Sequence, residues 1–176
     1  MCTRAEDQFT PHARQDLERL FGDILTWPGP RERINPTDPL LAVRLQEGDH
    51  TAAPLPWGLV PAGKTPQDRK RVTTNARVET LGEKPTSQGT FLAGRRCVVP
   101  LSAFSEPGAS HTPKRGEPRR WHRGHRPDGR PLLAAGLWEV TVTPERPLES
   151  VTVVTREPVP DRGYTTGCPP CCSRET

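Results

Sequence analysis

The second residue of the chain, Cys2, could carry unusual chemistry once Met1 is removed. Removal leaves an α-amine and a thiol on adjacent carbons. The reference pKa of an α-amine is about 7.7–8.0, so a useful fraction is neutral near pH 7 and can attack an aldehyde to form a Schiff base. The thiol can then close onto the imine carbon to give a five-membered thiazolidine, a ring that a lysine cannot form. The alternative interpretation is an incidental second residue.

A second candidate group lies in the segment Thr74–Thr80, which contains an amide, a guanidinium and a carboxylate. If this segment is a strand, Asn75, Arg77 and Glu79 share one face, because side chains alternate along a strand. Arg77 could then bind a phosphate with two parallel hydrogen bonds, and Asn75 could hold a reacting group. The alternative is a solvated polar strand face.

The third candidate is Glu106, which follows Phe104 and Ser105 just after an apolar stretch that ends at Leu101. A carboxylate packed beside an aromatic ring can have a raised pKa and act as a general acid or base. The alternative is a glutamate in a surface turn.

The composition limits the class of protein. The chain has 176 residues, which suits one domain, and only 32% of them are hydrophobic. Its 22 prolines and 15 glycines indicate many turns, and its net charge of +4 is compatible with an anionic partner. The sequence contains neither an apolar run long enough to span a membrane nor a signal-peptide pattern. We therefore expect a cytoplasmic protein whose five cysteines are thiols.

The elements that must position these residues are short. Apolar residues at helical spacing before Gly22 predict a helix over residues 14–22. The basic stretch 107–131 is expected to be a loop or a weak hairpin around Asp128-Gly129. One early helix and no alternation of strands with helices predict a mostly-β α+β domain. Strands are predicted at residues 40–45, 55–60, 96–101 and 151–155, with a further apolar segment at 132–142.

The short motifs of the chain fall in a characteristic order. They are Met1–Arg4, Leu17–Gly22, Arg33–Pro39, Trp57–Pro61, Asn75–Thr80, Arg95–Pro100, Phe104–Glu106 and Ala135–Glu139. This order resembles the SOS response-associated peptidase (SRAP) family. The resemblance runs from residue 1 to about residue 155.

The resemblance implies a mainly antiparallel α+β fold with a few short helices and a positive groove over the active site. It implies a cysteine-type autopeptidase that crosslinks covalently, as a thiazolidine, to abasic sites in single-stranded DNA. Cys2 would be the nucleophile, Asn75 would orient it and Glu106 would be the acid/base group. Arg4 and Arg77 would lie at the DNA backbone. We expect a monomer near the nucleoid, with no cofactor, metal or membrane partner.

The chain departs from the family pattern near these sites. Thr3 replaces a glycine beside the nucleophile, and Pro107 replaces a tryptophan. The segment after Pro61 lacks the tryptophans that act as a base wedge in the family. Trp57 is a candidate DNA-binding residue for this reason, although packing in the core is the alternative that we favour.

The end of the chain differs more. The family has His-Asp-Arg-Met-Pro soon after the strand at 151–155, with its histidine in the active site, and this chain does not. A shifted reading of permitted codons for residues 163–176 restores that motif. We therefore expect residues 1–162 to be an incomplete SRAP domain without its C-terminal strands and helix, and residues 163–176 to be an out-of-frame tail. The lone pair Cys168 and Cys171 is too little for a zinc site.

The lost histidine leaves two alternatives to a crosslinking enzyme. One is a non-catalytic binder of single-stranded DNA that keeps the groove. The other is an inactive, pseudogene-like product that does not fold stably.

Overall fold

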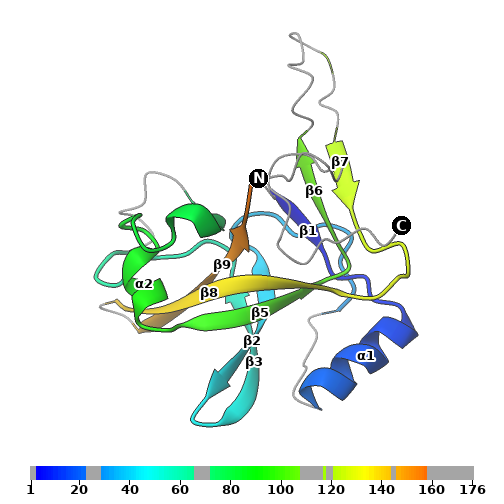
Figure 1. Ribbon diagram of the computed structural model, residues 1–176, viewed down its shortest axis with the longest axis horizontal. Coiled ribbons are helices and arrows are strands. Elements are labelled where there is room, and N and C mark those ends of the chain that lie inside the picture. Colours follow the sequence, from blue (N-terminus) through cyan, green and yellow to red (C-terminus); the bar gives the residue numbers. More distant parts are fainter. Residues whose placement is uncertain are drawn as a thin grey trace.

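The computed structural model describes residues 3–22, 29–65, 72–107, 117, 121–143 and 146–157 (Figure 1). The elements are β1 (Arg4–Glu6), α1 (Pro11–Phe21), β2 (Pro39–Gln46), β3 (Asp49–Pro56), β4 (Asn75–Arg77), the 3-10 turn η2 (Val78–Thr80), α2 (Gln88–Leu92), β5 (Arg96–Leu101), β6 (Ala103–Pro107), β7 (Trp121–Gly124), β8 (Leu132–Val142) and β9 (Pro147–Thr155). One sheet has the order β1-β6-β7, and the other has the order β3-β2-β5-β8-β9-β4. Most pairs are antiparallel and the helices are short, so the predicted α+β class is confirmed.

The six-stranded sheet is built around β5, β8 and β9, which run antiparallel to one another. Alternating side chains of these strands enter the main core, where Val99, Ala134 and Val153 are fully buried. The strands predicted at 96–101 and 151–155 are thus observed, although β9 begins four residues earlier, at Pro147. The apolar segment 132–142 is strand β8.

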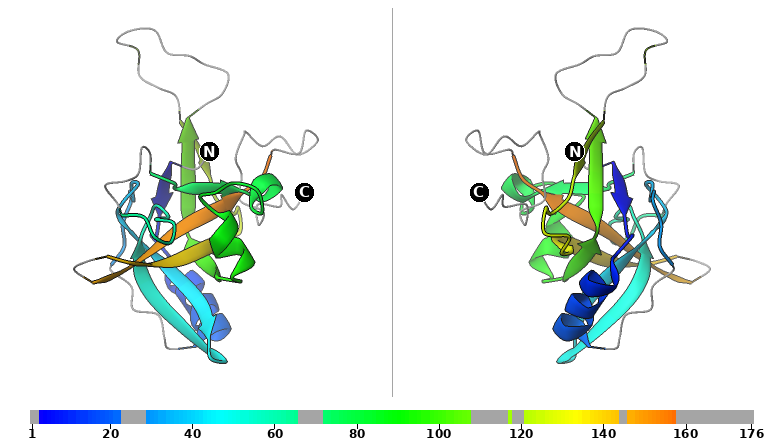
Figure 2. Two further views of the ribbon diagram at one scale, coloured as in Figure 1. Left: turned by 90° about the vertical axis from the view of Figure 1, so that its left-hand side faces the viewer. Right: turned by 90° about the vertical axis from the view of Figure 1, so that its right-hand side faces the viewer.

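Helix α1 starts earlier than its apolar spacing predicts. The hydroxyl of Thr10 accepts a hydrogen bond from the Ala13 amide at 3.1 Å, and Pro11 occupies the first turn. These two residues set the start, because a capping oxygen and a proline both suit an N-terminus. Gly22 ends the helix as predicted, with a φ of 77°. Leu17 faces inward, and Figure 2 shows the helix beside the β2-β3 hairpin.

The three-stranded sheet continues directly from the larger one. Strand β5 ends at Leu101, and β6 begins at Ala103 after the single residue Ser102. Strand β6 then lies between β1 and β7, with Phe104 opposite both Ala5 and Gly124. Ala5 and Phe104 belong to the same core cluster as Trp57 and Val153, so both sheets rest on one core.

The prediction of a loop or weak hairpin over residues 107–131 holds only in part, and the prediction that Glu79 shares a strand face is wrong. Residues 121–124 pair with β6 as strand β7, so no hairpin forms around Asp128-Gly129, which is instead a turn between β7 and β8. Glu79 does not share a strand face with Asn75 and Arg77, because β4 ends at Arg77 and a 3-10 turn follows. The carboxylate of Glu79 accepts a hydrogen bond from the Glu157 amide at 2.7 Å.

The described helices are also too short and polar to cross a membrane.

Candidate functional site

The N-terminal strand lies directly against the strand that carries Glu106. Arg4 pairs with Ser105, and the Thr3 amide donates a hydrogen bond to the Ser105 carbonyl at 3.2 Å. Glu106 is the next residue of β6 and is only 2% exposed. It is therefore a buried strand residue, and the alternative of a surface turn is excluded. Cys2, which precedes Thr3 in the chain, lies outside the described residues.

The three-stranded sheet has two chemically different faces. Ala5, Phe104 and Gly124 are direct partners across the three strands. Because side chains alternate, Glu106 shares their core-facing side. Arg4 and Arg123 occupy the opposite face.

That opposite face carries two arginines and the carboxylate of Glu6. The guanidinium carbon of Arg4 lies 3.5 Å from the centre of the Trp121 ring, which is cation–π geometry. Partial burial, followed by the charge of Arg33, lowers the pKa of Arg4. Arg123 binds Glu6 with an N–O distance of 2.7 Å, and this hydrogen bond raises the pKa of Arg123. A phosphate near Arg4 would thus meet the charge of Arg33 as well.

Strand β4 holds the other two candidate residues at the edge of the larger sheet. Asn75 and Arg77 pair with Val153 and Thr155 of β9, and the Asn75 amide donates to the Thr74 hydroxyl at 3.0 Å. Ala76, between them, is buried in a small cluster, so Asn75 and Arg77 share the other face. Within the described part of the chain, the Nη1 atom of Arg77 is buried without a hydrogen-bond partner. Such a guanidinium group is well suited to receive an anion.

Trp57 lies in the core and is fully buried, so its assignment to DNA binding needs correction. Its indole N–H donates to the Thr74 carbonyl at 2.8 Å, and its backbone pairs with Val151. A base cannot stack on a ring that other side chains cover on both faces. Trp57 instead anchors the residue that precedes Asn75.

Strand β6, which carries Glu106, and strand β9, which pairs with Asn75 and Arg77, run toward the same end of the molecule. In Figures 1 and 2, β6 and the last part of β9 both run toward that end. Glu106 lies near the end of β6, and Arg77 pairs with the last residue of β9. Arg4 and Glu106 lie on the adjoining strands β1 and β6, whereas Asn75 and Arg77 lie on β4, an edge strand of the larger sheet.

Some residues of the sequence motifs have structural rather than chemical roles. Glu139 is buried, forms an ion pair with Arg95 and accepts a hydrogen bond from the Thr90 hydroxyl at 2.6 Å. It joins α2 to β8. Burial raises the pKa of the Cys97 thiol to about 12, so this cysteine is protonated and unreactive near neutral pH.

Sequence reasoning missed Trp121 and His122, which enter the site only through the pairing of β6 with β7. Trp121 is opposite Pro107, and His122 is opposite Glu106. No sequence motif surrounds these two residues, so their place could be seen only from the register of β6 with β7.

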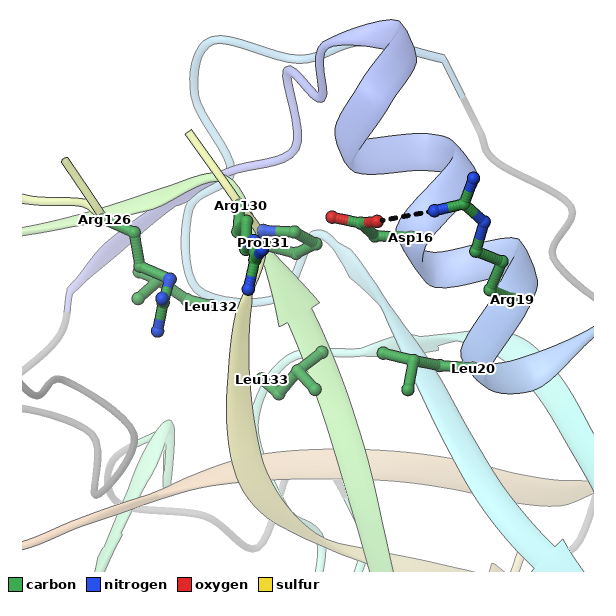
Figure 3. Close-up of a pocket in the computed structure, with 8 residues that line it drawn as sticks. All are labelled: Asp16, Arg19, Leu20, Arg126, Arg130, Pro131, Leu132 and Leu133. Carbon is green, nitrogen blue, oxygen red and sulfur yellow. Dashed lines mark ion pairs between the residues drawn. The ribbon is translucent and has the colours of Figure 1, made fainter. Parts of the chain in front are cut away.

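A separate cavity of about 470 Å³ lies between α1 and the start of β8 (Figure 3). Each of its arginines lies within ion-pair distance of a carboxylate. Arg19 lies 3.6 Å from Asp16. Arg126 and Arg130 lie 2.6 Å and 3.8 Å from Asp128. None of its lining residues belongs to the candidate site. The lining consists of Asp16, Arg19, Leu20, Arg126, Arg130, Pro131, Leu132 and Leu133.

Comparison with known proteins settles the family. The model of the SOS response associated peptidase (SRAP) family matches residues 1–162. The chain belongs to the SRAP family. Relatives of this SRAP chain include the abasic site processing protein YoqW of Bacillus subtilis strain 168, which is 31% identical over 130 residues. That match covers 73% of this chain but only 56% of YoqW. A second relative, YobE of the same bacterium, is 30% identical over 77 residues, or 44% of this chain and 35% of YobE.

Solved structures confirm the fold of this SRAP chain. A protein from Bordetella bronchiseptica matches with a TM-score of 0.73 and 23% identity, covering 96% of this chain and 79% of that one. A protein from Bacteroides thetaiotaomicron matches with a TM-score of 0.64 and 19% identity, covering 89% of this chain and 68% of that one. The SRAP-type α+β architecture predicted from the motifs is therefore confirmed.

Proposed function

We propose that this SRAP chain processes abasic sites in DNA by a covalent crosslink through Cys2. The observation that carries the proposal is the hydrogen bond of 3.2 Å between the Thr3 amide and the Ser105 carbonyl. It ties the chain next to Cys2 to the strand position next to Glu106. The names of YoqW and YobE, which describe abasic site processing, support the same reaction class.

The proposed chemistry starts from the ring-opened aldehyde of an abasic sugar. The α-amine of Cys2, freed by removal of Met1, attacks the aldehyde carbon, and Glu106 protonates the departing oxygen. The thiol then adds to the imine carbon. One C–N bond and one C–S bond form, and the aldehyde oxygen leaves as water. Asn75 orients the nucleophile in this scheme.

The proposed DNA contacts are electrostatic. The buried Nη1 atom of Arg77, which lacks a partner among the described residues, supports a phosphate contact at β4. The adjoining charges of Arg4 and Arg33 support a second contact beside β1. Single-stranded DNA fits this arrangement, because a sugar without its base must be reached outside a duplex stack. We expect the protein to act as a monomer in the cytoplasm, near the nucleoid.

The same N-terminal cysteine accounts for the peptidase in the family description, since its exposure requires removal of the residue before it. A non-catalytic binder of single-stranded DNA would keep the basic contacts but form no covalent bond. An inactive, pseudogene-like product would lack a cooperative melt.

The test is covalent trapping on an oligonucleotide with one abasic site. We expect a band that survives heating without borohydride, and we expect its loss in Cys2→Ala, because ring closure needs the thiol. A tag that keeps Met1 in place should also abolish the band, because the amine is then blocked. Cys97→Ala is the matched control and should form the band normally, since that thiol is buried. An undiminished band in Cys2→Ala would contradict the proposal.

A further inference from the structure

The buried carboxylate of Glu106 needs a route by which protons reach it. Each chain forms one crosslink, so Glu106 must take up a proton from water before the leaving oxygen departs. Glu106 is only 2% exposed, so water does not reach it freely. Its direct partner across the sheet is His122 of β7, which is exposed to solvent.

The register places these two side chains on one face. Phe104 and Gly124 are the neighbouring pair on that face. A Cβ atom on Gly124 would lie 2.4 Å from Cζ of Phe104, so the side chain from β6 reaches across onto β7. Opposite residues in antiparallel strands have Cβ atoms about 4.5–5.5 Å apart. Glu106 and His122 are therefore neighbours on the same face.

The other charged side chains of this sheet face away. Arg4, Glu6 and Arg123 are on the opposite face, where Arg123 is hydrogen-bonded to Glu6. Within the described residues of β1, β6 and β7, His122 is thus the titratable side chain that faces Glu106. Two further titratable residues, Glu117 and His125, flank β7 in the chain; both are exposed and outside its ladder.

We propose that His122 is a positioning residue that relays protons between water and Glu106. The inference rests on the proposed crosslinking function. The Glu106 carboxylate takes a proton from the His122 imidazolium and then gives it to the departing oxygen. The neutral imidazole then recovers its proton from water. Histidine suits this step because it exchanges protons near neutral pH.

The test measures single-turnover rates of adduct formation on an abasic oligonucleotide from pH 5.5 to pH 9. We expect His122→Ala to lower the rate about tenfold near pH 7 and to change the shape of the pH profile. Added imidazole should restore the rate of His122→Ala but not that of Glu106→Gln. His125→Ala is the matched control, because it removes an exposed histidine just beyond β7, and it should keep the normal profile.

The outcomes separate this inference from the function on which it rests. If the unaltered protein forms the adduct and His122→Ala keeps its rate and pH profile, the relay is wrong and the crosslinking function stands. A rate loss that imidazole does not restore also overturns the relay, since the role of His122 is then structural. If the unaltered protein forms no adduct, the proposed function fails, and the relay fails with it.

Discussion

At the scale of single residues, Glu106 is buried and lies on the strand that pairs with the N-terminal strand β1. We predict that Glu106→Gln slows adduct formation by about 10²–10⁴-fold, the usual effect of losing a general acid. Glutamine keeps the shape of the side chain, so non-covalent DNA binding should change little. Single-turnover trapping and a binding titration on the same oligonucleotide would measure the two effects. A variant with a normal trapping rate would remove Glu106 from the mechanism.

Trp57 acts on the site through a backbone contact. We predict that Trp57→Phe lowers the free energy of unfolding by about 1–3 kcal/mol. The Thr74 carbonyl loses one of its two hydrogen bonds, and the smaller ring leaves space in the core. The control is Trp121→Phe, which changes a half-buried ring at the sheet edge. It should lower the free energy of unfolding much less. Urea melts would measure both. If Trp57→Phe lost DNA affinity at full stability, the ring would be a DNA contact after all.

At the scale of elements, the close contact of β5 with β8 depends on Gly136. A Cβ atom there would lie 2.7 Å from the Cys97 Sγ and 3.0 Å from the Thr152 carbonyl oxygen. We predict that Gly136→Ala destabilises the fold by about 1–3 kcal/mol, because a well-packed core resists extra volume. Gly89→Ala is the control: it lies in helix α2 with open space around it. It should be neutral or stabilising, and thermal melts would show whether the two variants differ.

The sequence predicts those elements whose signal is local. Gly22 ends α1 as predicted, and the β-branched run of β9 forms the strand expected from it. The five-residue helix α2 was not predicted, since Gln88–Leu92 is too short for a periodic pattern. Strand β7 was missed because its polar residues become a strand only by pairing with β6.

The candidate site also contains residues with a local sequence signal and residues placed only by strand pairing. Motif order predicted Asn75, Arg77 and Glu106 as candidate residues, and all three lie on strands. Motif order could not predict His122 as a neighbour of Glu106. These two residues are far apart in the chain, and their pairing leaves no pattern in the local sequence. The burial of Trp57 likewise depends on the whole core rather than on its neighbours in the chain.

At the scale of the whole molecule, both sheets share one core, and the family match extends to residue 162. The residues beyond it lie outside the described part of the chain. We propose that residues 163–176 are translated out of frame. One choice of synonymous codons for them, read after two skipped bases, gives Leu-His-Asp-Arg-Met-Pro-Ala-Val-Leu-Leu-Pro-Arg-Asp.

The prediction is that the gene carries a one-base slip, or its two-base equivalent, between the codons for Thr155 and Gly163. Sequencing the gene is the measurement. Correcting the slip should yield a longer protein that forms the abasic-DNA adduct faster than the present chain. The absence of a His-Asp-Arg-Met-Pro reading in both alternative frames would rule the slip out and would require a role for the cysteines at 168, 171 and 172.

The central claim is a thiazolidine at the N-terminus, and mass spectrometry of the trapped adduct tests it most directly. After nuclease and protease digestion, the account predicts an N-terminal peptide that begins at Cys2 and carries the abasic sugar remnant. Its mass should equal the sum of peptide and sugar aldehyde less one water, and borohydride should leave that mass unchanged. An adduct on a lysine, or on a peptide that still begins with Met1, would contradict the account.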